Sequence, residues 1–150
     1  MATVKIEGLK ELRKELAALG PAWVKELKDL NYLTAQKVDR RARSNASTKM
    51  ERSVAATIRP SKIQAGAQVR MGGKPYTLGA EFGAAQNRPR PGKSWKGGTI
   101  RGWNQFRPTA GRGETAGYFF WPAIRSEFDE GALDDYMDAL MKIARRAFPD

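Results

Sequence analysis

The residue types available for chemistry in this 150-residue chain are few, because the sequence contains no histidine and no cysteine. Their absence removes the commonest general base, the commonest metal ligands and any thiol nucleophile. Glu81 is the clearest remaining candidate, since it stands beside Phe82 and Gly83 in a short Ala-Glu-Phe-Gly run. A lone acid without a convergent partner nearby in the sequence is typical of a structural or interface role. We therefore predict a protein that is not an enzyme and that uses no metal or cofactor.

The charge of the chain is large, positive and unevenly placed. Lys and Arg number 27 against 16 Asp and Glu, which gives a net charge of +11. Residues 61–117 carry 10 basic and 2 acidic side chains, whereas residues 118–150 carry 4 and 7. Long-range attraction responds to charge and not to chemical identity, so DNA and the acidic face of a protein are equally good partners for the middle of the chain.

Residues 84–117, which we call the basic segment, concentrate this positive charge and are rich in Gly, Pro and Trp. The segment is too long for an ordinary connection in a small domain, and segments of this kind usually form functional surfaces. Its arginines are interleaved with aromatic residues, and Trp and Arg are enriched at the centres of protein interfaces. We expect an interface built from Arg88, Arg90, Trp95, Arg101, Trp103, Phe106, Arg107 and Arg112, with Glu81, Phe82, Phe119 and Trp121 from the flanking sequence.

Two other interpretations of the basic segment stay open. Its cations could attract phosphate groups while its aromatic rings stack on unpaired bases. It could also be a solvated loop whose charge keeps the subunit soluble. We favour contact with another protein subunit, because small DNA-binding proteins normally carry their basic residues on a regular element that fits a groove.

The N-terminal part of the sequence predicts a short strand and two helices. Residues 3–6 alternate between polar and apolar types, which is typical of a strand. The leucines of residues 9–19 recur at helical spacing. The Gly20-Pro21 pair that follows ends this helix and begins a second one over about residues 22–43.

The rest of the chain predicts a strand pair and a final helix. Residues 54–58 and 65–71 alternate in polarity, which favours two adjacent antiparallel strands. The sequence does not decide between a strand and a helical turn for residues 75–83. A final amphipathic helix is expected over residues 122–148, with acidic side chains early and basic ones late, and Gly131 could break it.

Four consecutive aromatic residues, 118–121, precede this final helix. Aromatic runs at the entry to a helix most often fill a core. We expect Phe120 and one neighbour to be buried and the others to reach an interface. The acidic residues expected on the solvated side of the helix are Asp134, Asp135 and Asp138.

Together these elements predict a single α+β domain spanning residues 1–150. N-terminal helices and a C-terminal helix would pack on a small, mostly antiparallel sheet, and the basic segment would form a long basic loop. The sequence has no apolar run of 18 residues and no secretory-length apolar stretch at its N-terminus. We therefore expect a soluble, intracellular protein without membrane contact.

Three motifs, taken in their order, resemble a known family. The chain opens with a short strand and a leucine-rich helix from Val4 onward, later shows Ala-Glu-Phe-Gly at residues 80–83, and then Phe-Phe-Trp-Pro-Ala at residues 119–123. This order is similar to that of the small neck or tail-completion proteins of long-tailed phages. In that family a Glu-Phe-Gly signal precedes an aromatic-Pro-Ala signal that starts the last helix. The family leaves a short gap between the two signals, whereas this sequence has 34 residues.

The resemblance implies a structural virion protein, assembled in the host cytoplasm and placed at the head-tail junction. It would be a tail-completion or head-tail joining subunit that forms a ring with copies of itself and contacts neighbouring head-connector and tail proteins. A ring requires one surface of each subunit to complement a different surface of the next. The alternative is a small basic nucleic-acid-binding protein that contacts DNA through the basic segment.

Overall fold

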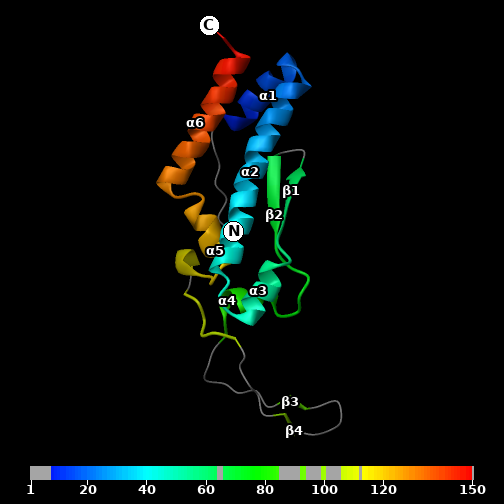
Figure 1. Cartoon of the computed structure of the whole chain (residues 1–150), viewed down its shortest axis with the longest axis vertical. Coiled ribbons are helices and arrows are strands. Elements are labelled where there is room, and N and C mark those ends of the chain that lie inside the picture. Colours follow the sequence, from blue (N-terminus) through cyan, green and yellow to red (C-terminus); the bar gives the residue numbers. More distant parts are fainter. Residues whose placement is uncertain are drawn as a thin grey trace. The chain divides into compact units, whose positions relative to one another are not determined.

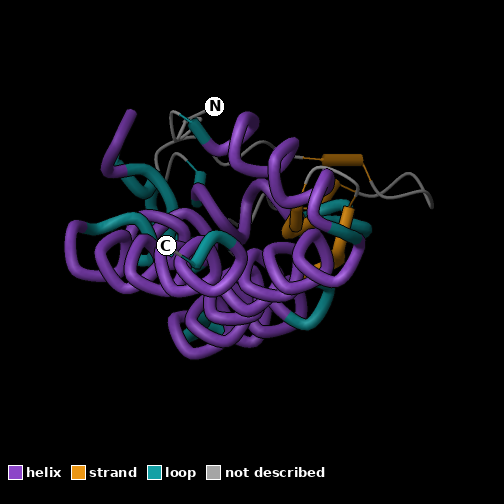
Figure 2. Tube along the Cα trace, turned by 90° about the horizontal axis from the view of Figure 1, so that it is seen from above, coloured by secondary structure: helices purple, strands orange, loops and turns teal. Residues whose placement is uncertain are grey.

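The computed structural model describes residues 8–63, 66–84, 92–93, 99–100, 106–111 and 113–149. They form an α+β fold in which helices predominate (Figure 1; Figure 2), so the predicted fold class is confirmed. The strand expected at residues 3–6 lies outside the described residues. The elements are α1 (Leu9–Leu19), α2 (Pro21–Asn45), α3 (Lys49–Ala55), β1 (Arg59–Ile63), β2 (Gly66–Arg70), α4 (Thr77–Phe82), β3 (Gly92–Lys93), β4 (Thr99–Ile100), the 3-10 turn η1 (Gly113–Thr115), α5 (Phe120–Ser126) and α6 (Glu130–Ala147).

The chain divides into two compact units. The first unit comprises residues 1–37, 60–69 and 127–150, and the second unit comprises residues 38–59 and 70–126. Helix α2 therefore contributes its first part to one unit and its last part to the other. A single domain over the whole chain stays a prediction.

The core of the first unit is formed by α1, the first part of α2 and α6. Its buried side chains are Leu16, Leu27, Leu140, Ile143 and Ala147. Leu12, Trp23, Leu30, Tyr136 and Met137 pack against them and are partly buried. These residues recur at the three- and four-residue spacing of a helix face, so the predicted helices at both ends of the chain are confirmed.

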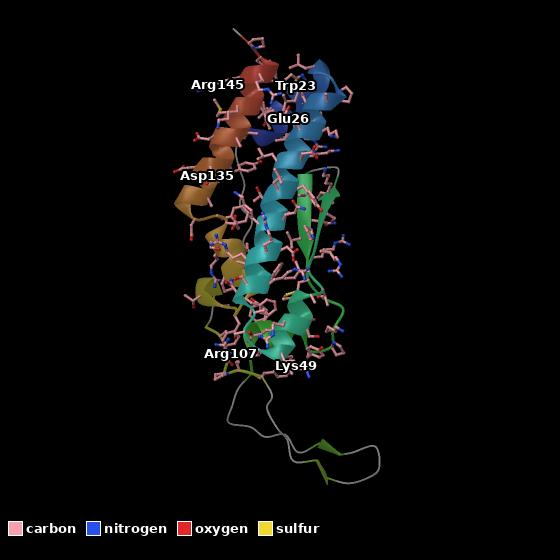
Figure 3. All side chains as sticks on the ribbon, viewed as in Figure 1. Trp23, Glu26, Lys49, Arg107, Asp135 and Arg145 are labelled. Atoms are coloured by element: carbon pink, nitrogen blue, oxygen red, sulfur yellow. The ribbon has the colours of Figure 1, made fainter. Side chains whose placement is uncertain are left out.

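Two polar contacts join α2 and α6 within the first unit. The Tyr136 hydroxyl donates to the Asn31 side-chain oxygen at 2.6 Å. The Arg146 guanidinium donates to the Glu26 carboxylate at 2.5 Å and lies 5.7 Å from the centre of the Trp23 ring. Trp23 and Glu26 lie on α2 opposite the last turns of α6 (Figure 3). These contacts fix which side of α2 faces α6.

Strands β1 and β2 pair into a two-stranded sheet and run in opposite directions beside α2 (Figure 1). Lys62 of β1 forms an ion pair with Asp29 of α2, and its ammonium lies 5.3 Å from the centre of the Tyr32 ring. At the start of β2, Gly66 has φ +148° and approaches the Asn31 side chain closely. The predicted strand at residues 65–71 is therefore confirmed.

The predicted strand at residues 54–58 is wrong, because these residues continue helix α3 and the turn after it. Thr48 caps α3: its hydroxyl accepts from the Glu51 backbone N–H at 3.1 Å, and the Glu51 carboxylate accepts from the Thr48 backbone N–H at 3.1 Å. This reciprocal capping satisfies two N–H groups at the helix start and favours a helix over a strand. Val54 and Ile58 are buried on the helix and its exit turn, whereas Ala56 between them is exposed.

The final helix expected over residues 122–148 is two helices. Helix α5 ends at Ser126 and α6 begins at Glu130. The residue before α6, Asp129, is extended, and its carbonyl accepts the first bonds of the new helix from Ala132 and Leu133, both at 3.0 Å. The break therefore precedes Gly131, which lies inside α6.

The second unit contains the last part of α2 together with α3, α4 and α5. Its buried apolar residues are Val38, Ala42, Ala46, Val54, Ala55, Ile58, Ala80, Phe119 and Ala123. The Arg43 guanidinium donates to the Ile58 carbonyl at 3.2 Å, and the Asn45 amide donates to the Phe119 carbonyl at 3.2 Å. Residues 75–83, which the sequence left undecided, form a turn and the short helix α4.

Candidate functional site at the base of the basic segment

The two ends of the basic segment are joined to each other by backbone hydrogen bonds. The Ala84 N–H donates to the Arg107 carbonyl at 2.9 Å, and the Ala110 N–H donates to the Phe82 carbonyl at 2.8 Å. Ala84 and Pro108 form a parallel bridge. The segment therefore leaves and rejoins the second unit at one closed point, which we call the base.

Part of the basic segment beyond the base is also paired. Strands β3 and β4 are antiparallel, with Gly92 opposite Ile100 and Lys93 opposite Thr99.

Two glycines allow the returning chain to approach the base. A Cβ atom on Gly83, whose φ is +70°, would lie 2.1 Å from the Pro108 carbonyl oxygen and 2.5 Å from that of Arg107. A Cβ atom on Gly79 would lie 2.5 Å from the Phe106 ring. Since neither contact is possible for a real side chain, only glycine permits this close packing. The predicted interface residue Phe106 is therefore packed against α4.

Glu81 joins the base to the start of helix α5. One carboxylate oxygen accepts the backbone N–H of Phe120 at 3.0 Å and that of Phe119 at 3.4 Å, and the other accepts the Trp121 N–H at 2.9 Å. The Glu81 carbonyl accepts the Tyr118 N–H at 2.8 Å. The Phe120 and Trp121 N–H groups belong to the first turn of α5, and those of Tyr118 and Phe119 immediately precede it, so none of the four has an intrahelical acceptor. One side chain therefore satisfies the start of a helix about 40 residues away.

The surroundings of Glu81 are closed. Its side chain is fully buried, and a Cβ atom on Gly117, whose φ is +100°, would lie 2.3 Å from one of its oxygens. Burial raises the pKa of the Glu81 carboxyl above its ordinary value, although the backbone N–H donors of Phe120, Trp121 and Phe119 and the charge of Arg125 oppose that rise. Both carboxylate oxygens therefore accept hydrogen bonds from the backbone at the start of α5.

Arg107 lies where the basic segment rejoins the second unit, and side chains of that unit bind its guanidinium. Its guanidinium lies 3.8 Å from the centre of the Tyr118 ring and donates to the Glu51 carboxylate at 3.3 Å and to the Ser47 hydroxyl at 3.2 Å. The Tyr118 hydroxyl donates to the Pro108 carbonyl. Figure 3 shows Arg107 near the start of α3, where Lys49 lies. Arg107 thus ties the returning chain to α3.

Glu51 is the second fully enclosed carboxylate of the base. Burial by itself would raise its pKa, but hydrogen bonds from the Thr48 and Ser47 backbone, the Ser47 hydroxyl and Arg107 outweigh burial and lower the pKa below its ordinary value of 4.5. The ionised form is therefore the one that the folded protein favours.

The structure separates the predicted interface residues into three groups. Arg88, Arg90, Trp95, Arg101, Trp103 and Arg112 lie outside the described residues. Phe82, Phe106 and Trp121 are partly buried at or near the base. Glu81 and Phe119 are fully buried, and Arg107 is exposed and paired with Glu51.

For Glu81 and Phe119 the expectation of an interface role needs correction. The side chains of these two residues are 0 % exposed, so a neighbouring molecule cannot reach them. Arg107 pairs with Glu51 and keeps a side chain that is 44 % exposed, so its interface role stays a prediction. Phe119 also takes the fully buried position that was expected for Phe120, which is only partly buried, because α5 begins at Phe120 and directs the preceding ring into the core.

Several residues of the base were missed by sequence reasoning. Ser47, Thr48 and Glu51 were not singled out, although the Thr-x-x-Glu spacing of a capping box was a usable signal. Gly79 and Gly117 were also missed. No local pattern marks these two glycines, because the groups that approach them come from distant parts of the chain.

The lowered pKa of Glu51 predicts how its contribution to stability depends on pH. A carboxyl with a lowered pKa in the folded state stabilises that state above its unfolded pKa, and this contribution is lost as the pH falls through the folded pKa. Replacing Glu51 by glutamine should therefore reduce the free energy of unfolding by about 1–2 kcal/mol at pH 7, and the difference from wild type should shrink progressively below about pH 4.5. Urea unfolding at several pH values measures this difference. A constant difference down to pH 3 would contradict it.

The part of the chain that the structure describes contains neither a cluster of metal-binding side chains nor a membrane-spanning helix. Its side chains form no group of three or more His, Cys, Asp or Glu that could hold a metal ion. None of its helices is long and apolar enough to cross a lipid bilayer. In comparisons with known proteins, no family model, no curated protein and no solved structure matches the chain.

Proposed function

We propose that this protein is a structural subunit of the phage neck, a tail-completion or head-tail joining protein that works as a ring at the head-tail junction. The observation that carries the proposal is the closed base, which presents a long basic segment from a fixed point. The order of the Glu-Phe-Gly and aromatic-Pro-Ala motifs supports the choice of family. The two motifs are also in contact, because the Glu81 carboxylate of the first motif accepts hydrogen bonds from the backbone at the helix start formed by the second.

The use of buried charge in the second unit also supports an assembly role. Glu51 and Glu81 are its two most deeply buried acids, and both are bound by groups that fix the base. Buried carboxylates kept for catalysis need a convergent partner and access to a substrate. Here they hold backbone and Arg107, so their role is to position the basic segment.

A joining assay tests the proposal. Alanine at Trp95, Arg101 and Trp103 removes the three expected anchors of the basic segment, and Arg107 is left unchanged because it holds the base. Buried aromatic and Arg anchors carry most of the energy of an interface. We therefore expect the variant to fold as wild type does but to lose head-tail joining, scored by complementation of a phage that lacks the protein.

A matched control keeps the result specific. Alanine at Lys49, Arg70 and Lys74 changes three exposed residues of the second unit outside the basic segment, and this variant should join normally. Normal joining by the basic-segment variant would overturn the proposal. DNA binding that weakens steeply between about 50 and 200 mM salt, and that the same variant loses, would instead support the nucleic-acid-binding alternative.

A further inference from the structure

The first unit has a groove lined by lysines. It has a volume of about 570 Å³ and lies between α1, α2 and β1. Ala17, Pro21 and Val24 supply apolar lining, and Lys25, Lys28 and Lys62 supply three cations. We call it the lysine groove.

The charges of the lysine groove are only partly neutralised inside the subunit. Asp29 accepts from Lys62 and, at 3.4 Å, from Lys25. The hydrogen bond from Lys62 is the largest influence on the Asp29 carboxyl and lowers its pKa. Lys28 forms no ion pair with any residue that the structure describes. Three lysines against one aspartate leave the groove positive.

The outer side of α6 carries a ridge of complementary character. Asp134, Asp138, Met141 and Arg145 are exposed and follow one another at three- and four-residue spacing, so they share one face of the helix. This face is opposite the one that packs Tyr136 and Leu140 into the core. The exposed fraction of Met141 is 46 %, which is large for an apolar side chain. We call these four residues the α6 ridge.

The carboxylates of the α6 ridge have no cationic partner of their own. Neither Asp134 nor Asp138 forms an ion pair within the described part of the chain. Lys142 follows Asp138 by four residues and Arg145 lies on the ridge itself, but neither forms an ion pair with these carboxylates within the described residues, and Arg146 is bound by Glu26. Two unpaired carboxylates and an exposed methionine therefore stand together on one helix face.

We propose that the α6 ridge of one subunit docks in the lysine groove of a second copy. Asp134 and Asp138 would meet the lysines, and Met141 would rest on the apolar lining. An amphipathic helix lying in a groove is a common mode of protein recognition, and unlike charges set its register. This inference rests on the proposed function in one respect: the contact would be the one that builds the ring.

The placement of the two surfaces makes the contact head-to-tail. The α2 residues of the core shared with α6, Trp23, Leu27 and Leu30, centre on a direction about 160° around the helix axis from the centre of Lys25 and Lys28, given 100° of rotation per residue. A subunit that docks its ridge in one neighbour thus keeps its own groove free for another. Contacts of this heterologous kind close into rings or continue as filaments.

Charge reversal tests the contact in the full-length protein. One variant carries Lys25→Glu and Lys28→Glu, and the other carries Asp134→Lys and Asp138→Lys. We expect the wild type to self-associate in sedimentation velocity between about 1 µM and 1 mM, more strongly at about 50 mM than at about 500 mM salt. Each variant alone should associate at least about 100-fold more weakly, because its two docking surfaces then carry like charges.

Mixing the two variants gives the sharpest result. The glutamates of the reversed groove then face the lysines of the reversed ridge, while the native groove faces the native ridge, so the equimolar mixture should recover assemblies of wild-type size. Recovery also proves that both variants are folded. A Lys49→Glu, Lys74→Glu variant has the same net charge as the groove variant and should associate as wild type does.

Each remaining outcome overturns the inference. The proposed contact is contradicted if the wild type stays monomeric at every protein and salt concentration. It is also contradicted if the charge-reversed variants still associate alone, or if their mixture does not recover assembly. The neck function is tested separately by joining. If the protein self-associates and the mixed variants recover assembly but joining activity is absent, the proposed contact is supported and the neck function is rejected. If the wild type joins heads to tails but never self-associates through these surfaces, the neck function is supported and the contact is rejected.

Discussion

Replacing Glu81 by alanine is expected to lower the free energy of unfolding by about 3 kcal/mol. The substitution removes the acceptor of three backbone N–H groups at the start of α5, and a buried donor left without a partner costs about 1–3 kcal/mol. Relaxation of the first helical turn toward water should keep the total below the sum of three such costs. Urea unfolding followed by circular dichroism measures the change.

Two further variants test why Glu81→Ala lowers the free energy of unfolding. Glu81→Gln keeps one oxygen acceptor but turns an amide N–H₂ toward the backbone donors, so it should lose about half as much stability. Glu15→Ala removes an exposed carboxylate from α1 and should change stability by less than about 0.5 kcal/mol. Equal stability of wild type and Glu81→Ala would show that the carboxylate does not hold the helix start.

The second large effect is expected from Gly83→Ala. The added methyl group would lie 2.1 Å from the Pro108 carbonyl oxygen and 2.5 Å from that of Arg107, and both are backbone atoms that cannot turn away. The base must therefore open or shift. We expect a loss of about 3 kcal/mol or more, together with faster proteolysis at the two ends of the basic segment.

Gly73→Ala is the matched control for this substitution. Gly73 also has a positive φ, +85° against +70° for Gly83, but a Cβ atom there meets nothing within 4 Å. Gly83 combines its φ with ψ −166°, a backbone region essentially restricted to glycine, where a side chain costs about 1–3 kcal/mol before any contact. The difference between the two substitutions therefore measures the close approach together with this backbone cost. Equal destabilisation by the two substitutions would mean that the base does not depend on contact at Gly83.

Local periodicity predicted the long helices well, because their burial follows a repeating pattern. The leucines of α1 and the Gly20-Pro21 boundary gave both N-terminal helices nearly to the residue. The same reasoning failed at residues 54–58, where three alternating apolar residues suggested a strand. There the capping box of Thr48 and Glu51, a signal only four residues long, determined the structure.

The base could not be predicted from the sequence in the same way. Its contacts join Glu81 to Phe120 and Ala84 to Arg107, across 39 and 23 positions. Which backbone will lie against which glycine depends on the tertiary fold, and no local pattern encodes it. The family resemblance placed the two motifs in order along the chain, but only the structure shows that they touch.

The closed base has a consequence for how the chain can vary. Bringing the ends of a flexible loop together costs conformational entropy that rises only with the logarithm of its length, so doubling the loop adds about 0.6 kcal/mol. Because Ala84 and Arg107 already hold those ends together, the base tolerates loops of very different length at nearly the same stability. A related scaffold with a short connection and this chain with its long one can therefore share one architecture. The residues between Ala84 and Phe106 can therefore vary in number without loss of the hydrogen bonds that close the base.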